Sequence, residues 1–278
     1  MTEICAALVV LTNLWGTVGV DLDCGRVVSY VSQGEEQLWM PKPPQSAPGW
    51  RHGGIPLCWP WFGVNEKGEI HGTAWHSAFE LSYIVRGADE CRAVLALCDG
   101  SRTLRYRLTL TDRLRLEAEV VNVGTNAFRY TIGFHPYFRV SSRDACSVEG
   151  LDGLSFVDDP SFPNGTNGVW HGVVRTTNAI DRIFAATGTV HTCVLREECG
   201  RMRKLTFEGA TDINVWNPGT NPEFDGILPI GAWRSFLCVE PVRFGEGDEV
   251  VLAPSEHRRH AMTIAPSATV VVPQHERH

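Results

Sequence analysis

The stretch Gly53-Gly54-Ile55-Pro56-Leu57-Cys58-Trp59-Pro60-Trp61-Phe62-Gly63 is the most informative part of this chain. Proline removes a backbone N–H and fixes φ, and glycine admits backbone angles that other residues avoid. The stretch is therefore predicted to be a rigid, wide loop rather than a helix or a central strand. Its aromatic faces suit the apolar faces of sugar rings, but tryptophans that plug a β-rich core would give the same pattern.

Further along the chain, apolar and polar residues alternate with a period of two. The alternation runs through residues 104–110 and resumes through 114–120, after a turn at Asp112-Arg113. Successive side chains of a strand point to opposite faces, so this pattern predicts a β-hairpin with one buried face. Further short strands are predicted near residues 7–12, 17–22, 27–31, 79–85, 94–98, 128–133, 191–196, 202–207, 212–216, 234–240, 248–252 and 261–265.

These strands predict an all-β fold, an antiparallel β-sandwich with many strands. No long helical period appears in the sequence. Helical and strand patterns do not alternate either, so a parallel α/β sheet is not predicted. Residues 1–272 are expected to form a single domain, and the tail 273–278 is expected to fray. Residues 158–172 are expected to form a loop.

The composition restricts the classes of function. Of the 278 residues, 43% are hydrophobic, which supports a sizeable core. The net charge of −7 argues against binding to nucleic acid or to an anionic membrane. The apolar run Ile4–Leu11 follows Glu3, with no Lys or Arg before it. It therefore lacks the charged start of a signal peptide, and it is too short to span a membrane.

Cysteine usage predicts a reducing environment. The chain has nine cysteines, an odd number that cannot all pair within one chain, and no Cys-x-x-Cys motif. Several stand in apolar runs, as Cys5, Cys98 and Cys238 do. This pattern is typical of reduced, buried thiols, and a cytoplasmic location is expected.

Two ionisable residues stand where apolar runs end. His135 precedes Pro136, which favours an extended backbone at residue 135, and Glu240 ends the apolar run 236–239. A carboxylate at the end of a buried strand is costly unless it is paired, hydrogen-bonded or functional. One carboxylate and one imidazole on opposite sides of a sugar ring could open and reclose that ring. A satisfied core histidine and a glutamate facing solvent remain open alternatives.

The opening stretch resembles the Gly-Gly-Ile-Pro-x-x-Trp-Pro-Trp-Phe-Gly signature of the hexose-6-phosphate mutarotases, or glucose-6-phosphate 1-epimerases. That family belongs to the galactose mutarotase-like superfamily. Four further motifs follow in the family's order: His71-Gly72-Thr73-Ala74, Gly133-Phe134-His135-Pro136-Tyr137-Phe138, Val215-Trp216-Asn217-Pro218 and Cys238-Val239-Glu240-Pro241. The resemblance extends from about residue 10 to residue 272. It implies a β-supersandwich of the galactose mutarotase type.

The resemblance also implies roles for single residues. His135 would be the acid that protonates the ring oxygen, and Glu240 would be the base that deprotonates the O1 hydroxyl. Asp181, in a motif similar to the family's Asp-Arg-Ile-Tyr, would accept hydrogen bonds from sugar hydroxyls. His71 would hydrogen-bond a hydroxyl or the ring oxygen. An ion pair of Asp181 with Arg182 and a water-facing turn position for His71 remain open.

The resemblance does not extend to the phosphate-binding residues, because three positions that contact phosphate in the family carry other residues here. His52 and Trp75 stand where the family has arginines, and Ile70 stands where it often has Gln. Loss of one charged hydrogen bond costs about 1.5–3 kcal/mol. Arg51 could reach in from the neighbouring position, and His52 could help when it is protonated. Trp75 could stack on a flat or apolar group instead.

We therefore expect a hexose mutarotase with weakened or altered phosphate recognition. The alternative is a non-catalytic carbohydrate-binding or regulatory module on the same fold. The expected partner is a small-molecule sugar or sugar phosphate, and the protein is expected to be a monomer. No nucleic acid, membrane or cofactor is expected to take part. No metal is expected either, because the His-x-x-His pairs at 257–260 and 275–278 lack a Cys or carboxylate in a fitting pattern.

Overall fold

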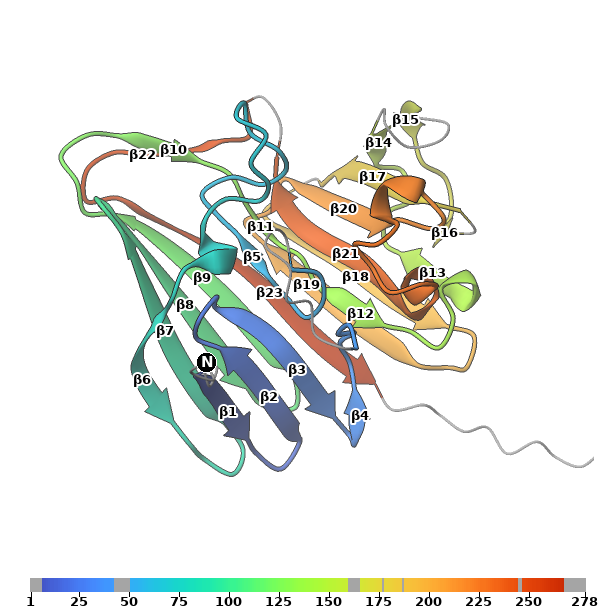
Figure 1. Cartoon of the computed structure of the whole chain (residues 1–278), viewed down its shortest axis with the longest axis horizontal. Coiled ribbons are helices and arrows are strands. Elements are labelled where there is room, and N and C mark those ends of the chain that lie inside the picture. Colours follow the sequence, from blue (N-terminus) through green and yellow to red (C-terminus); the bar gives the residue numbers. More distant parts are fainter. Residues whose placement is uncertain are drawn as a thin grey trace, which may run out of the picture.

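The computed structural model describes residues 7–42, 51–159, 166–176, 178–186, 188–244 and 247–267. Within these ranges the chain is all-β, as predicted (Figure 1). Its helical elements there are short 3-10 turns: η1 (Ala74–His76), η2 (Arg143–Ala145), η3 (Pro222–Phe224) and η4 (Ala232–Ser235). None of the described helices has the length and apolar character needed to cross a membrane.

A nine-stranded antiparallel sheet forms one layer, in the order β16-β13-β18-β19-β23-β9-β8-β7-β6. It contains the predicted hairpin, in which β8 pairs with β9 and Leu110 lies opposite Leu114. The strands are β6 (Glu80–Val85), β7 (Cys91–Asp99), β8 (Arg102–Leu110), β9 (Leu114–Asn122), β13 (Cys146–Glu149), β16 (Val174–Arg175), β18 (Val190–Glu197), β19 (Met202–Glu208) and β23 (His257–Ser267).

An eight-stranded sheet forms the second layer, in the order β15-β14-β17-β20-β21-β11-β5, with β12 also paired to β21. Its strands are β5 (Leu57–Cys58), β11 (Ile132–Phe134), β12 (Tyr137–Arg139), β14 (Ser155–Asp158), β15 (Asn167–Val169), β17 (Ile180–Ala185), β20 (Asp212–Asn217) and β21 (Phe236–Arg243).

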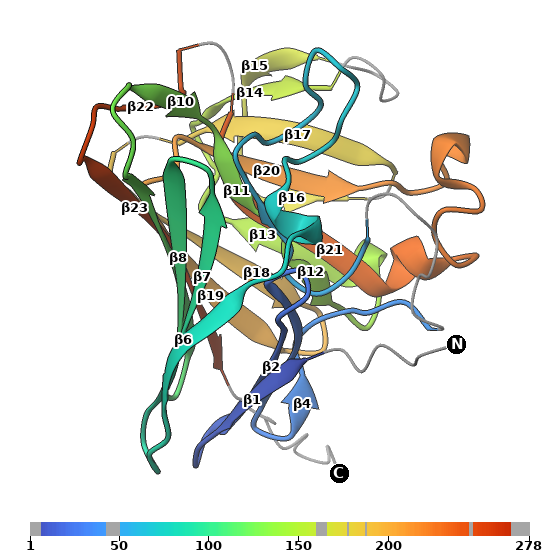
Figure 2. The same ribbon diagram turned by 60° about the vertical axis from the view of Figure 1, so that its left-hand side comes forward.

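A four-stranded sheet lies beside this second layer, on the same side of the nine-stranded sheet (Figures 1 and 2). It contains β1 (Leu8–Thr12), β2 (Gly16–Asp21), β3 (Arg26–Ser32) and β4 (Glu35–Glu36). A two-stranded ribbon joins β10 (Phe128–Tyr130) to β22 (Val250–Leu252). The layers form the predicted antiparallel sandwich, whereas the single-domain boundaries 1–272 stay a prediction.

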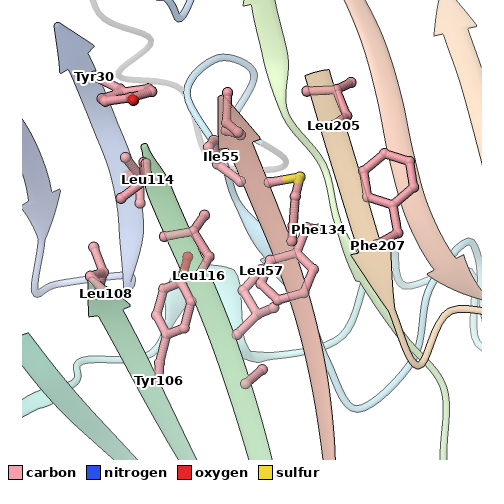
Figure 3. Close-up of a cluster of buried hydrophobic side chains, with 14 of the residues drawn as sticks. Tyr30, Ile55, Leu57, Tyr106, Leu108, Leu114, Leu116, Phe134, Leu205 and Phe207 are labelled. Atoms are coloured by element: carbon pink, nitrogen blue, oxygen red, sulfur yellow. The ribbon is translucent and has the colours of Figure 1, made fainter. Parts of the chain in front are cut away.

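The main core fills the space between the layers, as Figure 3 shows. Tyr106 and Leu116 from the nine-stranded sheet meet Leu57 and Phe134 from the eight-stranded sheet there, and Tyr30 joins from β3. All five side chains are buried. The alternating apolar residues of the hairpin thus face inward, as the period of two requires.

The opening stretch builds part of this sandwich. Leu57 and Cys58 form β5 at an edge of its sheet, so the stretch does not supply a central strand. Trp59 is 0% exposed and belongs to the core, which is the alternative that the sequence left open. Phe62 packs against His71, with ring centroids 4.9 Å apart, and the Trp61 indole N–H donates to the Glu69 carbonyl. The expectation of an aromatic platform for a sugar is therefore wrong for Trp59.

Two further expectations differ from the structure. Residues 158–172 contain β15 and the end of β14, where a loop was expected, and residues 160–165 lie outside the described ranges. Cys98 is exposed, because β7 turns Cys91 and every second residue after it inward, so residue 98 falls on the outer face. The described cysteines are all free thiols. Cys5 and the tail 273–278 are outside the described residues.

Candidate active site

Strand register places His135 opposite Glu240. Residue 135 lies between β11 and β12, and both strands pair with β21. The flanking pairs are Gly133–Val242 on one side and Tyr137–Cys238 on the other. The register continues without a shift across the break, so the position that faces Glu240 is residue 135. The His135 Nδ1 atom lies 3.5 Å from Glu240 Oε2, which brings the two predicted catalytic residues together.

The backbone of the opening stretch holds this segment from the other side. The His135 N–H donates to the Pro56 carbonyl at 3.0 Å, and the Tyr137 N–H donates to the Gly54 carbonyl at 2.9 Å. Pro136 stands between them and has no N–H to leave unsatisfied. The glycine- and proline-rich stretch therefore fixes the position of the imidazole through its backbone.

The site lies on the face of the eight-stranded sheet that is turned away from the main core. Leu237 and Val239 of β21 point into that core, as do Ile213 and Val215 of β20. Because side chains alternate along a strand, the residues between them point to the opposite face. Those residues are Asn214, Trp216, Cys238 and Glu240.

Cross-strand pairing orders these residues into two rows. Asp181 of β17 lies opposite Trp216, which lies opposite Cys238. In the next row, Asn214 lies opposite Glu240. Asp181 is only partly buried and is therefore the more accessible of the two carboxylates on this face. The predicted sugar-binding carboxylate is therefore on the same face as the catalytic pair, two strands away.

Glu240 is an unusual carboxylate. It is 0% exposed, and neither of its oxygens accepts a hydrogen bond within the described part of the chain. The same holds for Asn214 Oδ1. Burial raises the pKa of Glu240 well above its ordinary value, and the nearby Asp181 adds to this. Burial also raises the pKa of Asp181, to about 7. Buried acceptors without donors are rare, and they suit a site that binds hydroxyl groups.

His71 and His135 lie side by side as neutral imidazoles. Their ring centroids are 5.4 Å apart in an edge-to-face arrangement. Burial lowers the pKa of His71 to about 3 and the pKa of His135 well below its ordinary value. The Gly63 N–H donates to His71 Nδ1 at 3.1 Å, so the proton of that ring is on Nε2. The predicted position of His71 beside the acid–base pair agrees with this geometry.

His52 forms part of the site wall. Its Nδ1 is 2.9 Å from the Tyr137 hydroxyl, and its ring stacks on Trp216 with centroids 6.1 Å apart. Burial lowers its pKa to about 4, so His52 is uncharged at neutral pH. Arg51 precedes His52 in the chain, and Trp75 lies in η1. Arg51 is exposed, and the indole N–H of the half-buried Trp75 donates to the Ile70 carbonyl at 3.1 Å.

Two residues of the site were missed from the sequence. Asn214 stands two positions before Trp216 of a motif, so strand alternation alone could have placed it on the same face. Cys238 belongs to a quoted motif but was interpreted only as a buried thiol. His135, Cys238 and Glu240 have side-chain ligand atoms within 4.8 Å of one another, close enough to hold a metal ion.

A cavity of about 1080 Å³ lies apart from the acid–base pair. Trp39, Arg139 and Arg201 are among its lining residues. Trp39 packs against Tyr137 and Phe236, so this cavity and the site share a wall of aromatic side chains.

Comparison with known proteins identifies the family of this chain. Residues 25–265 match the sequence profile of a family described as aldose 1-epimerase. A protein of Escherichia coli K12, named provisionally as a glucose-6-phosphate 1-epimerase, is 25% identical over 255 residues, which cover 88% of this chain and 85% of its own. A protein of Cenchrus ciliaris with the same provisional name is 26% identical over 275 residues, covering 88% and 80% of the two chains.

Solved structures show the same fold. A protein of Salmonella typhimurium, described provisionally as a mutarotase, superimposes with a TM-score of 0.82 at 23% identity, over 94% of this chain and 90% of its own. A galactose mutarotase related enzyme of Lactobacillus acidophilus superimposes with a TM-score of 0.72 at 14% identity, over 95% and 98% of the two chains. The predicted galactose mutarotase type of sandwich is thereby confirmed.

Proposed function

Since the chain belongs to the aldose 1-epimerase family and is an isomerase of that kind, we propose that it interconverts the α and β anomers of an aldohexose by acid–base ring opening. We further propose that its recognition of a 6-phosphate is weak. One observation carries the proposal: the 3.5 Å contact of His135 Nδ1 with Glu240 Oε2, on a face that also holds Asp181.

The proposed reaction uses one base and one acid. Glu240 takes the proton from the O1 hydroxyl, and His135 gives a proton to the ring oxygen. The bond between C1 and the ring oxygen breaks, and the sugar becomes an open-chain aldehyde. Rotation about C1–C2 and closure on the other face then give the other anomer. Each positioned acid or base contributes roughly 10²–10⁴-fold to such a rate.

The pair holds a single proton before the sugar binds. Burial and the charge of Asp181 raise the pKa of Glu240, and burial lowers the pKa of His135; both shifts favour a proton on the carboxyl group over one on the imidazole. Its transfer to His135 gives a carboxylate and an imidazolium without changing the total charge. Sugar hydroxyls that donate to Glu240 stabilise the ionised form, which is the form that can act as a base.

Two further acceptors orient the sugar in this proposal. Asp181, at the solvent side of the site, accepts hydrogen bonds from hydroxyls that lie away from C1. Asn214 Oδ1 faces the site beside Glu240 and accepts another. His71 donates from Nε2 to a hydroxyl or to the ring oxygen.

The weak recognition of phosphate follows from charge. Arginine holds phosphate through a permanent charge and a fixed fork of donors. His52 is neutral at pH 7, since burial lowers its pKa to about 4, and Tyr137 already engages its Nδ1. Trp75 and Ile70 carry no charge. Only Arg51, next to His52 in the chain, offers a cation at these positions.

Anomer exchange, followed by NMR or polarimetry, tests the reaction. The wild-type protein is expected to accelerate exchange, and Glu240→Gln is expected to reduce the accelerated rate by roughly 10²–10⁴-fold. Glu80→Gln, at an exposed position of β6, is the matched control and should keep the wild-type rate. If the folded wild-type protein exchanges anomers only at the spontaneous rate, the chain is a binding module instead.

Comparison of substrates tests the phosphate proposal. Glucose, galactose and glucose-6-phosphate would be compared by kcat/KM under identical conditions. We expect no gain from the phosphate group, because the loss of two charged contacts costs about 3–6 kcal/mol in total. A strong preference for glucose-6-phosphate would contradict this proposal and leave the acid–base mechanism standing.

The cellular context and the oligomeric state complete the proposal. Free thiols throughout the described chain support a reducing compartment such as the cytoplasm. All proposed site residues come from one chain, which supports an active monomer. Light scattering of the purified protein would test this state.

A further inference from the structure

The acid–base pair has a third neighbour, the thiol of Cys238. The ligand atoms of His135, Cys238 and Glu240 all lie within 4.8 Å of one another. The topology explains this gathering. Cys238 and Glu240 are two residues apart in β21 and therefore share a face, and His135 lies opposite Glu240 in the same register.

We propose that His135, Cys238 and Glu240 form a binding site for Zn²⁺ or a similar thiophilic divalent cation. An imidazole nitrogen, a thiolate and a carboxylate are the ligand types that Zn²⁺ takes, at about 2.0–2.3 Å. Tetrahedral geometry then sets the ligand atoms roughly 3.3–3.8 Å apart. The 3.5 Å between His135 Nδ1 and Glu240 Oε2 already fits, and a shift of about 1 Å suffices for the thiol.

The state of Glu240 points to a ligand independently of the cluster. This carboxylate is fully buried, and both of its oxygens lack a hydrogen bond within the described ranges. Such a group is costly to bury, and a cation between it and the thiol would satisfy it. Tyr137, Trp216 and Phe236 surround Cys238 with aromatic rings that keep the surroundings of the thiol dry.

The donor set favours zinc over the hard cations. Mg²⁺ prefers six oxygen ligands in octahedral geometry, whereas the three side chains offer one nitrogen, one sulfur and one carboxylate. Three protein ligands leave a fourth position open on Zn²⁺ for water or for a sugar hydroxyl. We expect one ion to bind for each chain.

The site has a consequence for catalysis, and this part alone rests on the proposed function. An ion held by His135 and Glu240 occupies the atoms that would exchange protons with the sugar. Metal binding and anomer exchange therefore exclude each other. Zn²⁺ is expected to inhibit the exchange activity, and Mg²⁺ at the same concentration is not.

Binding is tested on the full chain with Co²⁺ as a spectroscopic probe and with Zn²⁺ in competition against a chromophoric chelator. The wild-type protein is expected to show a thiolate-to-Co²⁺ charge-transfer band, which Zn²⁺ abolishes. Cys238→Ala should remove this band and lower the affinity for Zn²⁺ by at least about tenfold. Cys193→Ala, which removes an equally buried thiol from β18, should change neither.

The site is overturned if the folded Cys238→Ala variant keeps both the charge-transfer band and the wild-type affinity for Zn²⁺. Should circular dichroism show that this variant does not fold, Glu240→Gln gives the answer, because it removes an anionic ligand with little change in shape. Unchanged Zn²⁺ affinity in that variant overturns the site as well. Zinc binding without any exchange activity in the metal-free protein would uphold the site and refute the proposed function.

Discussion

Burial sets the charge of single histidines throughout this fold. It lowers the pKa to about 4 at His52 and at His260, and to about 3 at His71. Each of these groups binds a proton more readily in the unfolded chain than in the folded one. Stability therefore falls as the pH falls through the interval between the two pKa values.

His260 offers the clearest test of this effect because it lies outside the candidate site. Its Nδ1–H donates to the Gly209 carbonyl at 3.1 Å, and its Nε2 lies 3.0 Å from the Tyr130 hydroxyl, from which it accepts. The pKa is about 4 in the folded chain, against an ordinary value of 6.5. Its contribution to stability is complete above pH 6.5 and is lost as the pH falls to about 4, a loss of roughly 3 kcal/mol.

We predict that His260→Gln has a shallower dependence of stability on pH between pH 7 and pH 4, because glutamine keeps a donor and an acceptor but does not titrate. The free energy of unfolding in urea, measured at both ends of this interval, checks the prediction. His257→Gln, at an exposed position of the same strand, is the control. Equal slopes for the wild-type protein and His260→Gln would show that this histidine is not responsible.

Sequence reasoning at this scale depended on motifs. His135 and Glu240 stand beside prolines in recognisable motifs, and their contact agrees with that assignment. Asn214 lies outside the quoted motifs, and Cys238 lies in one without a role assigned to its thiol. Their proximity to Glu240 arises from cross-strand pairing and from strand alternation, neither of which single-residue chemistry reveals.

Among the elements, the glycine- and proline-rich stretch acts through its backbone. Gly54 has φ of +69°, and a Cβ atom there would lie 2.2 Å from the Val27 carbonyl oxygen. This close approach allows Ile55 to bridge to Val27 of β3, while the Gly54 carbonyl accepts from Tyr137 N–H. A single residue without a side chain thus connects the four-stranded sheet to the segment that carries His135.

Gly54→Ala is expected to destabilise the fold by more than the roughly 1–2 kcal/mol that a left-handed backbone alone costs alanine. The excess comes from the clash with the Val27 carbonyl, and the exchange rate should fall with the displaced imidazole. Gly68→Ala is the matched control, since its φ is +79° and nothing lies within 4 Å of an added Cβ. Thermal or urea unfolding of both variants gives the comparison, and equal losses would refute the clash.

The elements that sequence predicted well are the long, regular strands. The hairpin β8–β9 alternates through residues 104–110 and 114–118, and its two strands meet at the turn around Asp112-Arg113. Short strands such as β13 and β15 have too few residues to show a period and gain their order from distant partners. β7 was recognised, but Cys98 was expected to be buried because it stands in an apolar run, whereas the strand places it on the outer face.

At the scale of the whole molecule, one buried arginine joins the three large sheets. Arg203 of β19 pairs with Glu197 at 3.0 Å and donates to Gln37 at 2.8 Å, next to β4. It also donates to the Arg139 carbonyl at the end of β12, at 2.8 Å. The second oxygen of Glu197 accepts from the Ser141 N–H and hydroxyl, at 2.8 and 2.9 Å. The ion pair is fully buried and hydrogen-bonded on both sides.

Arg203→Met is expected to lower the free energy of unfolding by about 3–5 kcal/mol, because Glu197 would stay buried with too little compensation. The double variant Arg203→Met with Glu197→Gln should lose less than the sum of the two single changes. Arg92→Met, which breaks an exposed pair with Glu90, should change stability by less than about 1 kcal/mol. Additive losses in urea unfolding would argue against coupling between the two charges.

The sandwich itself could be predicted from periodicity, whereas the arrangement of its strands could not. The pairing of β21 with β11 and β12 joins residues about a hundred positions apart. Local propensity contains no information about such partners. Hydrophobic periodicity could not predict that residues 135 and 240 belong to one site. That prediction came from the resemblance of their motifs to those of the family.

β21 keeps one register with β11 and β12 on the two sides of His135, so the number of residues between these strands is the property that mutation must not disturb there. Insertion or deletion of one residue between Gly133 and Tyr137 would rotate the imidazole to the opposite side of the sheet, away from its carboxylate. Loops elsewhere can lengthen without moving either group. The five consecutive positions 133–137 are therefore expected to keep a fixed length, whatever residues occupy them.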